Sequence, residues 1–398
     1  MTGAFGLQNT DKSSLHAIIL DDSFSMQGNE DVVKKSVEAI LKTIPDNSRI
    51  IWQNINSGVK YAGFKEDIPH LDALLTYTYH SGDLAASLNI LKKNLDYSVT
   101  NIDAELTGSN PNNLDELKNS PNYRYVKGNI TNKTLMEKLI EDNDCVINFA
   151  AESFVDRSIL DANQFLVSNI RGTYTILDIL RKHKKRLVQI STDEVFGSLK
   201  TGSADEISRF NPSNPYAATK ASAELLVNSY LNTYDLDCVI TRCTNNYGPR
   251  QFYEKLIPKT IFLANQNKKI PIYGKGENIR DWIYVDDHCE AVSKVLLDGK
   301  QGESYNISSG NEIDNLSIVK KILELLNKSS DLIEFVSDRP GHDLRYSLNS
   351  SKIRNSLKWN PETSFDDGLQ KTINWIINNS AGVNISENIL SSSPWENN

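Results

Sequence analysis

The stretch Arg186–Gly197, RLVQISTDEVFG, decides the fold predicted for this chain. Its first half is a short apolar run ending at Ile190, which is typical of a strand buried inside a parallel sheet. Its second half places a Ser-Thr-Asp-Glu run, residues 191–194, where the chain leaves that strand. Ligands bind at the carboxyl ends of the strands in open parallel sheets. The polar run therefore lies where we expect a site.

Two interpretations of Asp193 and Glu194 are open at this stage. Neighbouring carboxyl groups with different surroundings can titrate at different pH, which provides one acid and one base for catalysis. Alternatively, an Asp and a Glu after a strand only cap the chain end or hydrate the surface.

Short apolar runs alternate with amphipathic segments on both sides of this stretch, a pattern that predicts a parallel sheet covered by helices. The expected strands are Leu15–Leu20, Arg49–Ile55, Ser98–Ile102, Cys145–Phe149, Leu187–Ile190 and Cys238–Thr241.

Helical periodicity marks the segments between and after these strands. Beyond about Gly248 the pattern becomes irregular and aromatic, as in a lobe that covers a substrate. The expected helices are Asn29–Thr43, Asp161–Lys182, Ser213–Tyr234 and Asn315–Asn327.

Composition narrows the class of protein further. The 398 residues are enough for two or three domains, and 39% hydrophobic with 24% charged residues is near the globular norm. A net charge of −8 argues against nucleic acid as a partner. No apolar run reaches the roughly 20 residues of a membrane span, and the N-terminus lacks the pattern of a signal peptide. We therefore expect a cytoplasmic protein that does not bind a membrane.

Tyr216 and Lys220 form the second chemical signal, in the segment PYAATK at residues 215–220. Four residues apart on a helix, they share one face. An ammonium beside a phenol favours the phenolate, so this Tyr is expected to accept a proton near neutral pH. The pair is common by chance, but its position after the strand-end carboxylates strengthens the interpretation.

From about residue 97 to 378 the chain resembles the dTDP-glucose 4,6-dehydratases, a branch of the extended short-chain dehydrogenase/reductase family. Its adjacent Thr-Asp-Glu triplet separates this branch from sugar-nucleotide epimerases. The resemblance is carried by PNYRYVKGNI (121–130), FAAESFVDRSI (149–159), STDEVFGS (191–198), SNPYAATKASAELLV (213–227), TRCTNNYGPRQFYEKLIP (241–258), IRDWIYVDDH (279–288), YNISSGNE (305–312) and DRPGHDLRY (338–346).

This resemblance implies a dehydration of dTDP-glucose to dTDP-4-keto-6-deoxyglucose with transient reduction of NAD. Tyr216 would remove the C4 hydroxyl proton, helped by Lys220 and Thr192. Glu194 would then remove the C5 proton while Asp193 protonates the departing C6 hydroxyl. The chemistry requires one neutral and one ionised carboxyl group.

The resemblance also implies binding residues for a nucleotide-sugar substrate and for NAD, beside Tyr216 and Lys220. Arg suits a diphosphate because its planar fork reaches two oxygens. The expected cofactor contacts are Asp103, at the ribose, and Asn129, Ile130, Ala150 and Ala151. The expected substrate contacts are Asn246, Glu254, Lys255, Leu256, Arg280, Asn306, Arg339 and His342.

The dinucleotide-binding turn departs from the family pattern. Counting back from the ribose-binding acid places the three expected glycines at Tyr77, His80 and Asp83. A side chain in this turn blocks the approach of the pyrophosphate to the backbone, and an acid repels it. Smaller departures are Asn129 in place of an Asp and Phe154 in place of a His.

The segment 15–44 resembles instead the opening of a von Willebrand factor type A domain, whose first strand ends in Asp-x-Ser-x-Ser. Here these positions are Asp21, Ser23 and Ser25, whose oxygens suit Mg²⁺. A Ser near residue 81 replaces the usual Thr of that domain. Whether these residues bind a metal or cap a strand end stays open.

We predict an α/β fold with a doubly wound, Rossmann-like parallel sheet, an atypical first βα unit and a smaller C-terminal substrate lobe. Two interpretations of the N-terminal part are open. In the first, residues 72–79 and 84–93 rebuild the first strand and the first helix of the nucleotide-binding fold. In the second, a truncated metal-site domain is joined to a truncated dehydratase, by gene fusion or through an erroneous gene model. The expected parts are 1–94 (atypical N-terminal segment), 95–250 (NAD-binding-type core), 251–378 (substrate lobe) and 379–398 (mobile tail).

The leading functional hypothesis is a dehydratase whose cofactor turn is altered. The alternative is a non-catalytic binding protein, favoured by the missing glycines and opposed by the retained catalytic set. The resemblance also implies a homodimer that pairs through two helices, here near Asp161–Lys182 and Ser213–Tyr234.

Overall fold

The structure is a computed structural model that describes residues 4–8, 14–20, 49–54, 58–64, 98–106 and 108–380. The chain divides into two compact units. The first comprises Met1–Val99 with Leu114–Arg124, and the second comprises Thr100–Asn113 with Tyr125–Asn398. The expected substrate lobe, 251–378, thus lies in the second unit, whereas residues 95–99 and 114–124 of the expected core, 95–250, lie in the first.

The first unit contains a four-stranded sheet in the order β1-β2-β3-β4. Strand β2 runs parallel to β3, whereas β1 and β4 are antiparallel edge strands. The two strands predicted here, β2 and β3, are confirmed. The strand bounds are β1 Ala4–Gln8, β2 Ser14–Leu20, β3 Arg49–Asn54 and β4 Gly58–Phe64.

Several N-terminal predictions fall outside the described residues. They are the helix at Asn29–Thr43, the candidate metal ligands Asp21, Ser23 and Ser25, and the whole stretch 65–97 with the three altered glycine positions. The C-terminal residues 381–398 also lie outside them.

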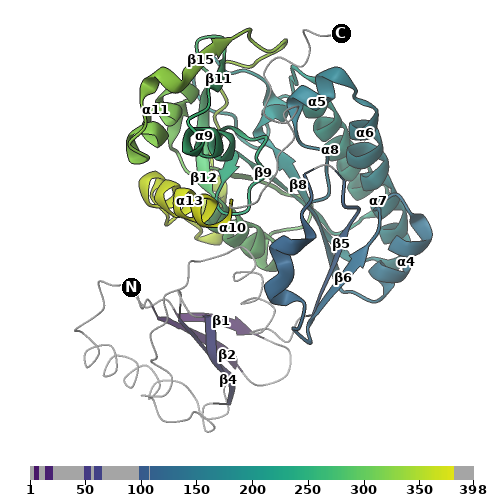
Figure 1. Cartoon of the computed structure of the whole chain (residues 1–398). Coiled ribbons are helices and arrows are strands. Elements are labelled where there is room, and N and C mark those ends of the chain that lie inside the picture. The colour runs from purple at the N-terminus through teal and green to yellow at the C-terminus, as the bar shows by residue number, and fades with distance from the viewer. Residues whose placement is uncertain are drawn as a thin grey trace. The chain divides into compact units, whose positions relative to one another are not determined.

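A parallel sheet in the order β13-β9-β8-β7 forms the centre of the second unit (Figure 1). Apolar residues of β8 and β9 are buried on both faces, Leu187 and Ile240 in one cluster and Val188 and Val239 in the other. This confirms the predicted doubly wound α/β fold. The bounds are β7 Cys145–Asn148, β8 Arg186–Thr192, β9 Cys238–Cys243 and β13 Ser304–Ile307.

Two further strands, β5 (Val99–Asp103) and β6 (Tyr123–Lys127), pair with each other as a separate two-stranded sheet. The 3₁₀ helix η3 (Pro111–Leu117) connects them. Strand β5 ends at Asp103, the expected ribose-binding acid, so the carboxyl end of this sheet carries the residue that the sequence placed there.

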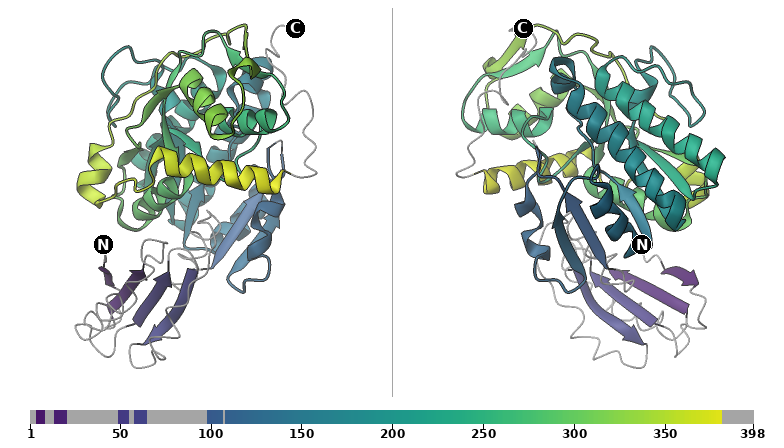
Figure 2. Two further views of the ribbon diagram at one scale, coloured as in Figure 1. Left: turned by 60° about the vertical axis from the view of Figure 1, so that its left-hand side comes forward. Right: turned by 90° about the vertical axis from the view of Figure 1, so that its right-hand side faces the viewer.

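Helices α7 and α8 lie side by side along one face of the central sheet (Figure 2). The single helix expected over Asp161–Lys182 is instead three segments, with a π-helix, η4, in the middle. The bounds are α4 Lys133–Glu141, α5 Val155–Leu160, α6 Asn163–Phe165, η4 Leu166–Arg171, α7 Gly172–His183, α8 Pro215–Tyr234 and α10 Val285–Asp298.

The π-helix holds the buried side chain of Asn169 against two other segments. Its amide donates to Glu152 O (3.0 Å) and Thr219 Oγ1 (2.9 Å) and accepts from the Glu152 backbone N–H (2.9 Å). A widened turn is a common feature near functional sites. Here the hydrogen bonds of Asn169 connect η4 to the loop after β7 and to α8.

The remaining elements form the lobe beside the sheet, with apolar cores between α9, α11 and α13 (Figure 1). No helix of the described residues is both long and apolar enough to cross a membrane. The bounds are η5 Asp193–Phe196, β10 Asn245–Tyr247, α9 Leu256–Asn265, β11 Ile270–Tyr273, β12 Ile279–Tyr284, β14 Glu312–Asp314, α11 Asn315–Leu325, η6 Ser330–Leu332, β15 Ile333–Val336, α12 Ser351–Leu357 and α13 Phe365–Asn379.

Candidate active site

The end of β8 organises the candidate site. Thr192 is the last strand residue and the N-cap of η5, where its hydroxyl oxygen accepts from the Glu194 backbone N–H at 3.3 Å. The same hydroxyl donates to Asp193 Oδ1 at 3.1 Å. The sharp turn from strand to 3₁₀ helix therefore fixes the two carboxyl groups relative to each other.

Asp193 and Glu194 differ strongly in their surroundings. Asp193 is only 3% exposed, and burial together with the negative charge of Glu194 raises its pKa from 3.8 to about 8. Its Oδ2 has no hydrogen-bond partner among the described residues. At neutral pH this carboxyl group is protonated, as a general acid must be.

Glu194 is held as a hydrogen-bond acceptor. Its Oε2 accepts from the Asn214 side-chain amide and from the Tyr346 hydroxyl, both at 3.2 Å. The Tyr346 hydroxyl also lies 2.5 Å from Asp343 Oδ2, and Ser213 donates to the other oxygen of Asp343. These contacts fix the position of the Glu194 carboxyl group after β8.

Helix α8 supplies the Tyr-Lys pair. The helix begins at Pro215, a favoured first residue, and the Asn214 side chain caps it by accepting from Ala217 N at 2.9 Å. Tyr216 and Lys220 follow in the first turns, both buried. The predicted placement of the pair on one helix beside β8 is confirmed.

The expected phenolate is not favoured in this structure. Burial and the charge of Glu194 raise the pKa of Tyr216 well above 10, although a hydrogen bond with Thr192 acts in the opposite direction. Burial lowers the pKa of Lys220 to about 8. The Lys220 ammonium donates to Ile190 O at 2.6 Å, so its charge is directed at the backbone of β8.

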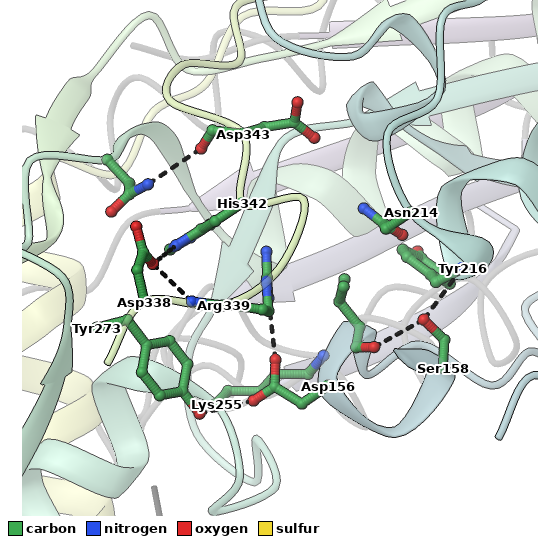
Figure 3. A network of polar contacts seen from close by, with 12 residues as sticks. Asp156, Ser158, Asn214, Tyr216, Lys255, Tyr273, Asp338, Arg339, His342 and Asp343 are labelled. Carbon is green, nitrogen blue, oxygen red and sulfur yellow. Dashed lines mark hydrogen bonds and ion pairs between the residues drawn. The ribbon is translucent and has the colours of Figure 1, made fainter. Parts of the chain in front are cut away.

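A pocket of about 170 Å³ opens beside Glu194, and we call it the substrate pocket. Figure 3 shows Arg339 and Tyr273 converging on Asp156, with distances of 3.1 Å and 2.8 Å to its two carboxylate oxygens. Seven of the eight expected substrate contacts line the pocket, namely Asn246, Glu254, Lys255, Leu256, Arg280, Arg339 and His342.

The cationic residues of the pocket are held by neighbours. The Arg280 guanidinium lies 4.2 Å from the centre of the Tyr346 ring and donates to Ile279 O and Asp343 O. Burial and the charge of Arg339 lower the pKa of His342 to about 4, so this His is neutral at physiological pH. It contributes hydrogen bonding rather than positive charge.

Asn306, the eighth expected contact, does not line the pocket. It lies in the middle of β13, is fully buried, and donates to Ala204 O at 3.0 Å. A central strand position turns the side chain into the sheet core. Asn315, nine residues later at the start of α11, lines the pocket instead.

A second cavity of about 440 Å³, which we call the cofactor cleft, lies between the carboxyl ends of β5 and β7. Asp103 is positioned there because its oxygens accept from Glu105 N (2.7 Å) and Ser109 Oγ (3.0 Å). Carboxylate oxygens retain further acceptor capacity for ribose hydroxyls. Of the expected cofactor contacts, Asp103, Asn129, Ile130, Ala150 and Ala151 line this cleft, whereas Tyr216 and Lys220 do not.

The described wall of the cleft fits an adenine dinucleotide. Small residues leave the backbone after β7 accessible, and Asp103 ends strand β5 at one wall of the cleft. The cleft and the substrate pocket also share a rim. The residues common to both are Ser153, Gln251, Glu254 and Lys255.

The sequence analysis missed several pocket residues. Asp156 lies within the quoted FVDRS segment, and its position at the start of α5 is the signal that could have found it. The others belong to elements that the sequence did not place beside the site. They are Lys259, Tyr273, Asn315 and Tyr346.

Fold and site together define a nucleotide-binding α/β protein of the short-chain dehydrogenase/reductase type, with a Thr-Asp-Glu triplet and a Tyr-Lys pair. The chain belongs to the GDP-mannose 4,6 dehydratase family, whose sequence model matches residues 86–372. This match leaves most of the N-terminal segment unassigned, so its likeness to a von Willebrand factor type A domain stays a prediction.

Individual relatives agree with this assignment. Low-salt glycan biosynthesis protein Agl12 of Haloferax volcanii is 48% identical over 288 residues, covering 72% of this chain and 93% of the relative. A dTDP-glucose 4,6-dehydratase of Streptomyces niveus is 43% identical over 284 residues, covering 71% and 84%. The crystal structure of DesIV, a dTDP-glucose 4,6-dehydratase from Streptomyces venezuelae with NAD and TYD bound, has a TM-score of 0.72, 38% identity, and coverage of 75% and 95%.

Proposed function

We propose that this chain is an NAD-dependent lyase that converts dTDP-glucose to dTDP-4-keto-6-deoxyglucose. The observation that carries the proposal is the pair Asp193 and Glu194, one carboxyl group buried and protonated and the other an acceptor of two hydrogen bonds. The relatives named for this reaction support the substrate, and the DesIV complex supports NAD.

When bound, NAD⁺ would supply the hydride-transfer chemistry, as the acceptor of the C4 hydride and its later donor to C6. Asp103, Asn129, Ile130, Ala150 and Ala151 would hold it. Lys220, fixed against Ile190 O, keeps a positive charge beneath the reacting face of the site.

The residues of the chain would move the protons. Tyr216, hydrogen-bonded with Thr192, takes the C4 hydroxyl proton. Glu194 takes the C5 proton, which the neighbouring ketone has made acidic. Asp193 gives its proton to the C6 hydroxyl, which leaves as water. Once the hydride has been returned to C6, Glu194 would give its proton back to C5, so the sugar loses one water molecule and undergoes no net oxidation.

The test of this proposal begins with the purified full chain. It is denatured, and the released NAD is assayed. The native protein then receives dTDP-glucose and NAD, and the formation of a 4-keto-6-deoxy sugar is measured. Released NAD or NAD-dependent product formation is the expected result. A chain that neither carries NAD nor forms product is not this enzyme.

We also propose that the protein acts in the cytosol as a homodimer that pairs through α7 and α8. Exposed apolar side chains on this face support the pairing, with Leu225 60% and Tyr174 47% exposed. Sedimentation of the native protein and of Leu225→Glu tests the dimer: the substitution should shift the protein toward the monomer. Cell fractionation tests the location.

A further inference from the structure

Lys259, one turn into α9, is a buried lysine that lines the substrate pocket. It is 8% exposed, and burial lowers the pKa of its ammonium. Among the described residues, no hydrogen-bond or ion-pair partner reaches its Nζ. Its Nζ is not among the fully buried polar atoms that lack a partner, so it reaches the open space of the pocket. A ligand bound in the pocket would supply an acceptor for it.

The carboxylates nearest to Lys259 are engaged with other donors. Asp156 accepts from Arg339 and Tyr273 through its two oxygens. Glu254 accepts from Arg157 at 3.2 Å. Both carboxylates act on Lys259 only at longer range, where their charges favour its protonated form. These two carboxylates therefore do not occupy the N–H groups of Lys259, which leaves them for a ligand in the pocket.

The start of α9 adds further donors to the same region. Lys255 is the N-cap, and its side chain does not cap the helix but donates to Ser153 O at 2.9 Å. Leu256 and Ile257, the first two helical residues, line the pocket. Backbone N–H groups of a first helical turn have no intrahelical acceptor. Lys259 and the helix start thus face one ligand region.

The walls around this region favour a flat, uncharged group. Leu256, Ile257, Pro271 and Ile272 line it with apolar surface. A phosphate would lie near two carboxylates here, whereas a neutral carbonyl oxygen meets no such repulsion. We propose that Lys259 donates to a ring carbonyl oxygen of the nucleobase of the nucleotide-sugar substrate. This inference rests on the proposed function and adds a residue that selects the base.

The test is the affinity of the full-length protein for two nucleoside diphosphates, measured by titration calorimetry with the cofactor cleft saturated with NAD so that ADP cannot bind there. Thymine has ring carbonyl oxygens and adenine has none, while dTDP and ADP share the same diphosphate. Lys259→Met should weaken dTDP binding about 10- to 100-fold, as expected for a lost bond from a charged donor, and leave ADP binding unchanged. Lys268→Met, an exposed lysine just after α9, is the matched control and should change neither affinity.

Equal loss of dTDP and ADP affinity would place Lys259 at the phosphates and overturn the proposal, as would unchanged dTDP binding. Thermal unfolding checks the fold, and Lys259→Met should melt at or above the wild-type temperature because it removes a buried charge. Lys259→Gln, which keeps an amide donor, should bind dTDP more tightly than Lys259→Met. Because binding requires no turnover, a wild-type chain that binds dTDP without dehydrating dTDP-glucose would refute the proposed function alone.

Discussion

The substrate pocket and the cofactor cleft are built from different materials. The pocket is walled by charged and polar side chains that hold one another, such as Arg339 on Asp156 and Arg280 on the Tyr346 ring. The cleft is lined by small residues such as Gly128, Ala150 and Ala151 together with charged side chains, among them Asp103 at the end of β5. The two ligand sites therefore differ in their lining although they lie in the same unit. Single substitutions should affect binding or catalysis at one site without changing ligand binding at the other.

Tyr216→Phe should have the largest effect, because it should reduce turnover without changing cofactor binding. Removing the hydroxyl that accepts the C4 proton should lower kcat by about 10²- to 10⁴-fold, the usual contribution of a general base. The amount of NAD that the protein retains should not change, because the substitution leaves the residues that line the cofactor cleft in place. Stopped-flow turnover and NAD release measure the two effects. Tyr230→Phe on the same helix is the control and should remain active.

The next prediction distinguishes the roles of the two neighbouring carboxyl groups, Asp193 and Glu194. Glu194→Gln should still permit C4 oxidation, seen as NADH absorbance, but block water loss, because no base remains for the C5 proton. Asp193→Asn should slow the departure of the C6 hydroxyl, with kcat reduced about 10²-fold or more. If Glu194→Gln lost both half-reactions equally, the assignment of roles would be wrong.

A smaller effect is expected from a substitution in the cofactor cleft. Asp103→Ala should raise the Kd for NAD about 10- to 100-fold, since hydrogen bonds to a charged group are lost at the ribose. With saturating NAD, kcat should return toward the wild-type value, and dTDP affinity should stay constant. Calorimetry with each ligand checks this. Asp298→Ala, at an exposed position on α10, serves as the control.

The last effect concerns stability and its pH dependence rather than turnover or ligand affinity. The pKa of Asp193 is about 8 in the folded chain and near 3.8 when exposed, so the unfolded chain binds fewer protons between these values. Stability conferred by the neutral carboxyl group is therefore lost as the pH rises from about 4 to 8. Asp193→Asn should melt at a higher temperature than the wild type at pH 8 and at the same temperature near pH 4.

Side-chain chemistry was the part of the site that the sequence could predict. Thr192, Asp193 and Glu194 follow an apolar run, and Tyr216 and Lys220 share a helical period, so local patterns suffice to place them. The strands β7, β8 and β9 were predictable for the same reason, since runs of buried residues in parallel sheets are continuous.

Features set by tertiary contacts were not predictable from local patterns. Asn306 and Asn315 both lie in a strand-turn-helix segment, and only the register of β13 against β9 shows which one is buried in the sheet. The π-helix η4 depends on the contacts of Asn169 with distant segments. The raised pKa of Tyr216 depends on burial that no pair spacing reveals.

The rim shared by the two cavities has a thermodynamic consequence. Arg157 lines the cofactor cleft, Glu254 lines both cavities, and the two are joined by an ion pair. A nucleotide sugar that alters this pair changes the affinity for the dinucleotide. Linkage is reciprocal, so the dinucleotide must change the affinity for the sugar by the same factor. Each ligand that alters this pair thereby shifts the equilibrium affinity of the other.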